Sequence, residues 1–314
     1  MQSYLLKNKK KISFWEGIKT LENTTQFSYR TAVKHFDSFC FVKYNRTIND
    51  IVSELKTLQY EDIHTAFSGL LQDFIHYLEK YGLANQTIYN YCQITIYYFG
   101  HNGIRVHSSD LRRSIRFPKI VKEKRHPLTI NEIHQLFRHT PTKRKMLYLL
   151  LIGSGMRIRE TTCLRKKDFD FDQKRIKIEI PAQFTKTKTA HTSFVSKQAE
   201  KQLRPHLESL RNNDLVFATN ENNPYNAGMT EIEAFTRYRN NSGLTEKYDT
   251  TNRHLITLHS FRSYFFVRAR RIHDTDIAHG MIGHNAYLPI YDRKDDDEKL
   301  ELYLKVEPSL RIKL

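Results

Sequence analysis

The stretch Gly153-Ser-Gly-Met-Arg-Ile-Arg-Glu-Thr-Thr-Cys-Leu164 decides how the second half of the chain folds. It follows an almost wholly apolar run, residues 145–152, which predicts a buried helix that stops at the two glycines. Arg157 comes soon after this stop and Glu160 follows three residues later, so on a helix their side chains would share a face. The guanidinium fork could then bind a phosphate while the carboxylate orients it. A surface ion pair would explain the same two residues, so this motif alone does not identify a phosphate site.

Downstream of this stretch the pattern changes from helix to strand. Residues 176–180 alternate between apolar and charged side chains, and residues 192–195 form a plausible second strand. The run Thr185-Lys-Thr-Lys188 lies between them on a predicted hairpin, from which a lysine can reach into a cleft and protonate a leaving alkoxide. Counting back from the second strand favours Lys186, with Lys188 as the alternative, although a solvated basic turn would explain both. The sequence therefore predicts a mainly helical protein with a small antiparallel sheet, of the α+β class.

A third motif is Leu258-His-Ser-Phe-Arg-Ser-Tyr264. His259 and Arg262 are three residues apart on a predicted helix, so their side chains point the same way. Phe261 and Phe265 are expected to face the core. A histidine and an arginine on one face suit a phosphate that gains negative charge during a reaction. A lone His-x-x-Arg is nevertheless too common to identify a site.

A fourth motif is Gly283-His284, which is followed by Tyr287 and Tyr291. A tyrosine can attack a phosphodiester and hold the phosphate as an ester. Because the ordinary pKa of tyrosine is about 10, such a tyrosine needs cationic neighbours or a base.

The chain also predicts a division into domains. The first half is rich in helical patterns that end at signals such as Gly82, and it is followed by a proline-containing, strongly basic segment typical of a linker. Thr129 and Glu132 form a capping-box pattern that opens a further domain. The expected parts are a basic N-terminal arm over residues 1–20, a helical domain over 21–111, a basic linker over 112–127 and a second domain over 128–314.

The composition favours a polyanion as the partner. Among 314 residues, 51 Lys and Arg stand against 34 Asp and Glu, which gives a net charge of +17. The three cysteines are sparse and odd in number, so neither a disulfide framework nor a cysteine-rich zinc site is expected. The fifteen histidines form no metal-binding motif, and the acidic run 295–298 is explained better by a solvated helix start than by a cation site. No apolar run approaches membrane-spanning length, and we expect a protein of the reducing cytoplasm.

Taken together and in this order, the four motifs resemble those of the tyrosine recombinase family, also called the phage integrase family. That family has an arginine box, a hairpin lysine, a His-x-x-Arg box, a Gly-His pair and then a tyrosine. The resemblance covers nearly the whole chain, because the family also has a helical core-binding domain that clamps DNA before a basic linker and a catalytic domain. The phrases Tyr-Leu-Pro-Ile-Tyr291 and Glu-Leu-Tyr-Leu-Lys-Val-Glu-Pro308 look closest to archaeal members.

The resemblance implies how the phosphate is held. Arg157 and Arg262 would bind the scissile phosphate and neutralise its developing charge. His284 would donate a hydrogen bond to the same phosphate, and Glu160 would position the arginine and the histidine.

The resemblance also implies the reacting groups. His259 would assist proton transfer, Lys186 would protonate the departing 5′ oxygen, and Tyr291 would be the nucleophile that forms a 3′-phosphotyrosyl bond. The interval from His284 to Tyr291 is two residues shorter than is usual in the family, so Tyr287 and Tyr303 stay open as alternatives. The phosphotyrosyl bond conserves energy, so no metal and no cofactor is expected.

The expected function is site-specific recombination of double-stranded DNA, integrating or excising a mobile element, by a homotetramer assembled on paired sites. The expected location is the cytoplasm, in association with the nucleoid. The C-terminal residues 305–314 would contact a neighbouring subunit or fold back on their own chain. Two alternatives stay open: a DNA-binding architectural or regulatory protein without catalysis, and an enzyme similar to the type IB topoisomerases.

Overall fold

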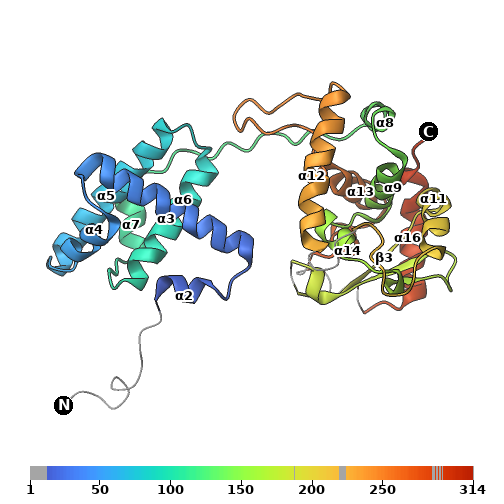
Figure 1. The fold of residues 1–314 in the computed structure, drawn as a ribbon, viewed down its shortest axis with the longest axis horizontal. Helices are drawn as coiled ribbons and strands as arrows, with labels where there is room; N and C mark the ends of the chain where they lie inside the picture. Colours follow the sequence, from blue (N-terminus) through green and yellow to red (C-terminus); the bar gives the residue numbers. More distant parts are fainter. Residues whose placement is uncertain are drawn as a thin grey trace, which may run out of the picture. The chain divides into compact units, whose positions relative to one another are not determined.

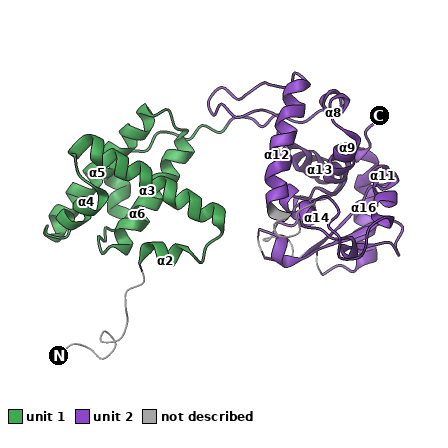
Figure 2. Ribbon diagram, viewed as in Figure 1, with its two compact units in different colours: residues 1–122 green, residues 123–314 purple. Residues whose placement is uncertain are grey.

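The computed structural model describes residues 13–186, 188–218, 224–284, 287, 289, 291 and 293–313, with only the backbone of residues 224 and 225. The chain divides into two compact units, residues 1–122 and 123–314, each with its own hydrophobic core (Figure 2). No helix among the described residues is long and apolar enough to cross a membrane.

Unit 1 is helical throughout its described part. Phe36 of α3 and Phe74 of α5 meet edge-to-face at 4.8 Å between ring centroids, and Phe36 meets Phe99 of α6 at 5.3 Å. Gly82, with φ +73°, follows the end of α5 as the sequence predicts. The helices are α2 (Phe14–Ile18), α3 (Asn23–Tyr44), α4 (Ile48–Leu55), α5 (Tyr60–Lys80), α6 (Asn85–His101) and α7 (Ser108–Ser114) (Figure 1).

Both ends of unit 1 are more ordered than the sequence suggests. Of the expected arm, residues 1–12 lie outside the described part, and the rest includes α2, which buries Phe14 and Ile18 in the core of the unit. The prediction of irregular structure from Arg112 onward is wrong for its first residues, because α7 continues to Ser114 and Ile115 after it is buried. Burial of these apolar side chains outweighs the surrounding positive charge.

Unit 2 is built around α9, in which every residue from Met146 to Ser154 is buried, as predicted for residues 145–152. Figure 1 shows α9 beside α13 in the middle of the unit, and Phe261 and Phe265 of α13 face the core as expected. The predicted capping box of Thr129 and Glu132 opens the first helix. The helices are α8 (Ile130–Arg138), α9 (Thr142–Ser154), α10 (Ile158–Thr162), α11 (Lys197–Glu208), α12 (Pro224–Asn241), α13 (His259–Ile272), α14 (Thr275–Met281) and α16 (Asp296–Leu310), with single 3-10 turns at Lys166–Asp168 and Ala182–Phe184.

The sheet has the antiparallel order β1-β2-β3. β2 (Lys177–Ile180) and β3 (His191–Phe194) were predicted, and they pair with Ile178 opposite Ser193. β1 (Phe169–Asp170) was not predicted, because two residues are too short to show an alternating pattern. The observed fold is therefore the mainly helical protein with a small antiparallel sheet that the sequence predicts.

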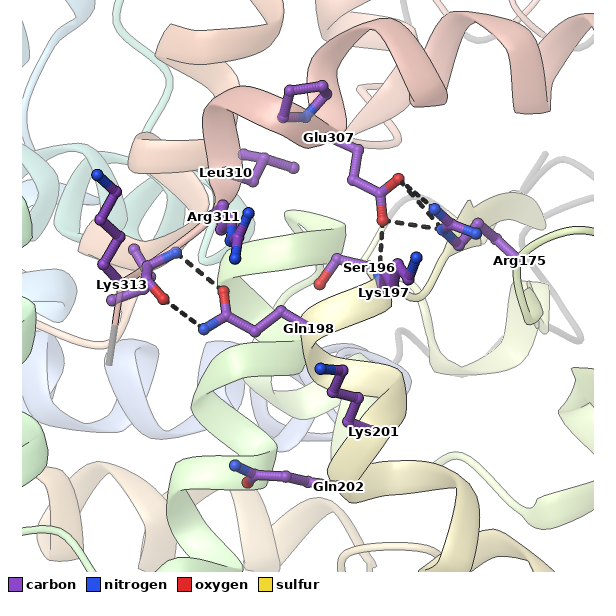
Figure 3. A pocket seen from close by; sticks show the side chains of 12 residues that line it. Arg175, Ser196, Lys197, Gln198, Lys201, Gln202, Glu307, Leu310, Arg311 and Lys313 are labelled. Atoms are coloured by element: carbon purple, nitrogen blue, oxygen red, sulfur yellow. Dashed lines mark hydrogen bonds and ion pairs between the residues drawn. The ribbon is translucent and has the colours of Figure 1, made fainter.

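The C-terminal segment packs against its own unit. Asp295 and Glu298 form a capping box at the start of α16, so the acidic run is a helix start, as expected. Beyond α16, Gln198 holds the backbone of Ile312 through two hydrogen bonds, from Gln198 Nε2 to the carbonyl at 2.5 Å and from the Ile312 amide to Gln198 Oε1 at 2.9 Å (Figure 3). Ile312 is buried, so in this single chain the tail folds back as one of its two expected alternatives.

Candidate active site

Arg157 and Glu160 meet at the start of α10. Arg157 is the N-cap residue with an extended backbone, so the two do not share a helix face as expected; they form a reciprocal cap instead. The Arg157 amide donates to Glu160 Oε2 at 2.9 Å, and Arg157 Nη1 donates to Glu160 Oε1 at 2.5 Å. Because the Glu160 side chain is only 1% exposed while Arg157 keeps 25%, the buried carboxylate fixes a guanidinium that still faces the surface.

Arg262 lies buried in the middle of the site. Its Nη1 donates to the carbonyl of Gly155 at 2.8 Å, and its Nη2 donates to the carbonyl of Ile282 at 2.6 Å. The side chain thus ties the turn after α9 to the turn before His284. Burial, and next the charge of Arg157, lower the pKa of Arg262 to about 10, while Glu160 opposes this shift.

Gly155 allows this arrangement. It ends α9 with φ +67°, and a Cβ there would lie 2.6 Å from the ring of Phe265. The backbone of this turn therefore approaches α13 closely enough for its carbonyl to accept the bond from Arg262.

His259 is the first residue of α13 and is exposed, one turn from Arg262. Its pKa is lowered, first by partial desolvation and then by the charges of Arg262, Arg125 and Arg157. The predicted His-x-x-Arg face is therefore present, and its histidine is held in the neutral form, which can accept a proton.

His284 follows Gly283, which has φ +69°. The pKa of His284 is lowered to about 4, by desolvation first and then by Arg262, His279, Arg157 and His259. His284 therefore belongs to the same electrostatic cluster as the two arginines. Its Nδ1 lies 2.6 Å from Nδ1 of His279, a residue that the sequence analysis did not select.

His191 in β3 is a second member that the sequence analysis missed. It is 4% exposed, and a Cβ on Gly283 would lie 2.6 Å from its Nε2. Its pKa is lowered by burial first, although Glu160 opposes the shift. In the sequence, a histidine in a strand of small and polar residues resembles a surface residue. All four residues of β3 are nevertheless buried, so only the packing of the sheet reveals that His191 lies inside the site.

The two candidate lysines lie between β2 and β3, as predicted. Lys186 is exposed in the turn after Ala182–Phe184. Lys188 is also exposed, has φ +54°, and its Nζ lies 3.4 Å from the carbonyl of Gln183. Thr187 between them lies outside the described residues. Both lysines are therefore exposed between the two strands, and the role of either one stays a prediction.

The three candidate tyrosines differ in their surroundings. Tyr291 is 1% exposed and lies in the core, where a Cβ on Gly280 would be 2.5 Å from its own Cβ. Tyr303 is also buried and donates its hydroxyl to the carbonyl of Gly153 at 2.8 Å. Tyr287 is partly exposed and stacks on His279 at 4.7 Å. The structure thus brings the arginines and histidines together but encloses the favoured tyrosine in the core.

The chemistry of the assembled cluster is that of an anion site. Arg157 and Arg262 lie near the buried carboxylate of Glu160, and the positive charge of Arg157 lowers the pKa of both Arg262 and His284. A phosphodiester entering the cluster would relieve this mutual repulsion and accept hydrogen bonds from the guanidinium groups. Within the described part of the chain, no group of three or more His, Cys, Asp or Glu side chains could hold a metal ion.

Comparison with known proteins identifies relatives of unit 2. Residues 126–290 match the model of the phage integrase family, a match that ends one residue before Tyr291. Two curated relatives are both named tyrosine recombinase XerA. The protein of Thermococcus kodakarensis is 30% identical over 103 residues, which cover 32% of this chain and 35% of that protein. The protein of Thermococcus onnurineus is 29% identical over 154 residues, which cover 41% and 52%. The matches thus span about a third to a half of the curated relatives.

The fold has counterparts among solved structures. A lambda integrase tetramer bound to a Holliday junction aligns with a TM-score of 0.58 at 16% identity, over 86% of this chain and 74% of that one. At this identity the likeness concerns the fold alone.

Proposed function

The chain belongs to the phage integrase family of tyrosine recombinases, and on this premise we propose that it is a site-specific DNA recombinase. It cuts and rejoins DNA strands through a 3′-phosphotyrosyl intermediate, and it integrates or excises a mobile element. The observation that carries the proposal is the cluster in which the buried carboxylate of Glu160 holds Arg157, and in which the charges of Arg157 and the buried Arg262 both act on His284.

The cluster provides the phosphate-binding half of this chemistry. Arg262 donates from Nη1 and from Nη2 to backbone carbonyls, which fixes the plane of its guanidinium, and each of these nitrogens carries a second N–H for a phosphate oxygen. Arg157 is held by Glu160 at the surface of the same cluster. Since the groups are fixed before DNA arrives, they can stabilise the extra negative charge of the transition state without reorganising.

The remaining groups attack the phosphate and transfer protons. The hydroxyl oxygen of Tyr291 forms a bond to phosphorus while the bond from phosphorus to the 5′ oxygen breaks. His259 takes the proton of the tyrosine, and Lys186 gives a proton to the departing 5′ oxygen. The reverse reaction with the 5′ hydroxyl of another strand restores the DNA backbone, so no energy source is consumed.

Tyr291 has to leave the core before it can react. Its ring is enclosed beneath Gly280 in the chain without DNA, so we propose that binding of DNA releases it toward the phosphate. This step keeps the nucleophile out of reach until a site is bound.

The wider arrangement follows from the family. We propose that unit 1, within residues 21–111, clamps double-stranded DNA together with the basic linker, and that unit 2 performs catalysis. We also propose a homotetramer on paired sites, as lambda integrase forms on a Holliday junction, and action at the nucleoid in the cytoplasm. The net charge of +17 suits both binding and retention on DNA.

The test uses a nicked suicide duplex that carries the site of the protein, obtained by selection from random duplexes. In EDTA, wild type is expected to form a covalent adduct that survives denaturation, and Arg262→Ala is expected to reduce its rate by about a hundredfold or more. An intact plasmid with two sites then gives recombinants. Relaxed circles without recombinants would indicate a topoisomerase, and tight binding without any adduct would indicate a DNA-binding protein without catalysis.

A further inference from the structure

His284 does not stand alone, because His279 of α14 lies against it. Their Nδ1 atoms are 2.6 Å apart, their ring centroids are 4.7 Å apart, and the ring planes are inclined by 25°, which suits a hydrogen bond between the ring edges. At this distance one nitrogen must carry a proton and donate it to the lone pair of the other, since two lone pairs or two N–H groups would repel each other.

Two further aromatic rings contact His279. Its ring lies 4.5 Å from that of Phe266 in α13 and 4.7 Å from that of Tyr287, both measured between centroids. These two ring contacts restrict the rotation of the His279 ring and so help to fix the direction of its Nδ1.

The shared proton also decides the tautomer of His284. Among the described residues, the groups that face His284 are Arg262, Arg157, His259 and His279, and its lowered pKa means that the ring is neutral at pH 7. A neutral imidazole carries one proton. If that proton lies on Nε2, then Nδ1 is an acceptor and the bridging proton belongs to His279.

We propose that His279 is a positioning residue, which donates from Nδ1 to His284 and thereby keeps the proton of His284 on Nε2 for donation to the scissile phosphate. This inference rests on the proposed function, because it assigns His284 the task of a donor. The opposite tautomer would offer the phosphate a lone pair, which would repel it.

Two variants separate the effect of the hydrogen bond to His284 from the effect of the ring contacts of His279. His279→Phe keeps an aromatic ring in contact with Phe266 and Tyr287 but removes the donor. His279→Asn places an amide N–H near the position of Nδ1 and restores the donor. We expect His279→Phe to slow adduct formation by about 10- to 100-fold with unchanged DNA affinity. His279→Asn should recover most of that loss, to within about fivefold of wild type.

A spectroscopic measurement keeps this test independent of cleavage. Nitrogen-15 spectra of the histidine rings should show His284 protonated at Nε2 in wild type and in His279→Asn, and mixed or reversed in His279→Phe. Equal cleavage by wild type and His279→Phe, or an unchanged tautomer in that variant, would overturn the proposal. Absence of an adduct in wild type would instead count against the recombinase function, and the spectra would still test the histidine pair.

Discussion

Gly283 has a left-handed backbone conformation directly before His284, and the ring of His191 lies against its Cα. A side chain at this position meets two obstacles, the conformation itself and the missing space. The Gly-His pair of the sequence is thus explained by packing as well as by chemistry. His191 could not be predicted, because nothing in its neighbourhood along the chain shows that β3 is buried on both faces.

Gly283→Ala tests this packing, and Gly82→Ala is its matched control. Gly82 has a similar φ of +73°, but a Cβ there has nothing within 4 Å. The control should lose about 1–2 kcal/mol of the free energy of unfolding, the cost of the left-handed conformation. Gly283→Ala should lose about 1–3 kcal/mol more, because the ring of His191 must shift, and should also slow cleavage. Equal losses in urea unfolding would contradict the close packing.

The histidines of the site make stability depend on pH. The pKa of His284 in the folded chain, about 4, lies below its ordinary value of 6.5 because of desolvation, Arg262, His279, Arg157 and His259. Below pH 6.5 the unfolded chain therefore binds more protons at this position than the folded chain does. The contribution to stability is complete above pH 6.5 and is lost as the pH falls toward 4.

Urea unfolding of wild type and His284→Gln between pH 8 and pH 4.5 measures this contribution. As the pH falls, the unfolding free energy of wild type should decrease more than that of His284→Gln. A difference that stays constant over this range would contradict the lowered pKa.

At the scale of elements, the sequence predicts what periodicity and caps encode. The buried helix α9, the strands β2 and β3, the capping box at Thr129 and the helix start at residues 295–298 are all present. The relation of Arg157 to Glu160 was predicted only in part, because their cap depends on where α10 begins, and helix starts are poorly fixed by sequence. The His279–His284 contact depends on how the turn after α14 folds back, which no local pattern encodes.

Glu307 connects α16 to the start of α11 and to the turn before β2, so its substitution tests how α16 is held. Its carboxylate accepts three hydrogen bonds from Arg175, at 2.8 to 3.1 Å, and one from the Lys197 amide at the start of α11, at 2.6 Å (Figure 3). Both side chains of the ion pair are largely buried. Glu307→Gln should therefore cost about 2–4 kcal/mol of unfolding free energy, because it leaves Arg175 without its counter-charge.

Glu301→Gln provides the control, since Glu301 lies exposed on the same helix. It should change the unfolding free energy by less than about 0.5 kcal/mol. Similar effects of the two substitutions, measured by chemical denaturation, would show that the Glu307 contacts do not hold α16.

At the scale of the whole molecule, each of the two units has its own core and the chain carries +17 charges. The sequence predicts this division because an apolar helical pattern gives way to a basic, proline-containing segment. How the two units grip DNA depends on their arrangement around a duplex, which a single chain does not encode.

DNA binding should depend steeply on salt. With roughly 6–10 phosphate contacts, affinity should fall about 10³- to 10⁵-fold between 50 and 200 mM salt. Residues 123–314 alone should bind more weakly and with a smaller slope of log affinity against log salt. A loss of less than about tenfold, or equal slopes for the fragment and the full chain, would contradict a clamp made by both units.

The most direct test of the central claim is the identity of the residue that becomes linked to DNA. Wild type, Tyr287→Phe, Tyr291→Phe and Tyr303→Phe are each incubated in EDTA with the suicide duplex and run on a denaturing gel. We predict an adduct for wild type, Tyr287→Phe and Tyr303→Phe, the last with slightly lower stability because the bond to Gly153 is lost. Tyr291→Phe should form none while still binding the duplex. An adduct that persists in Tyr291→Phe would contradict the account.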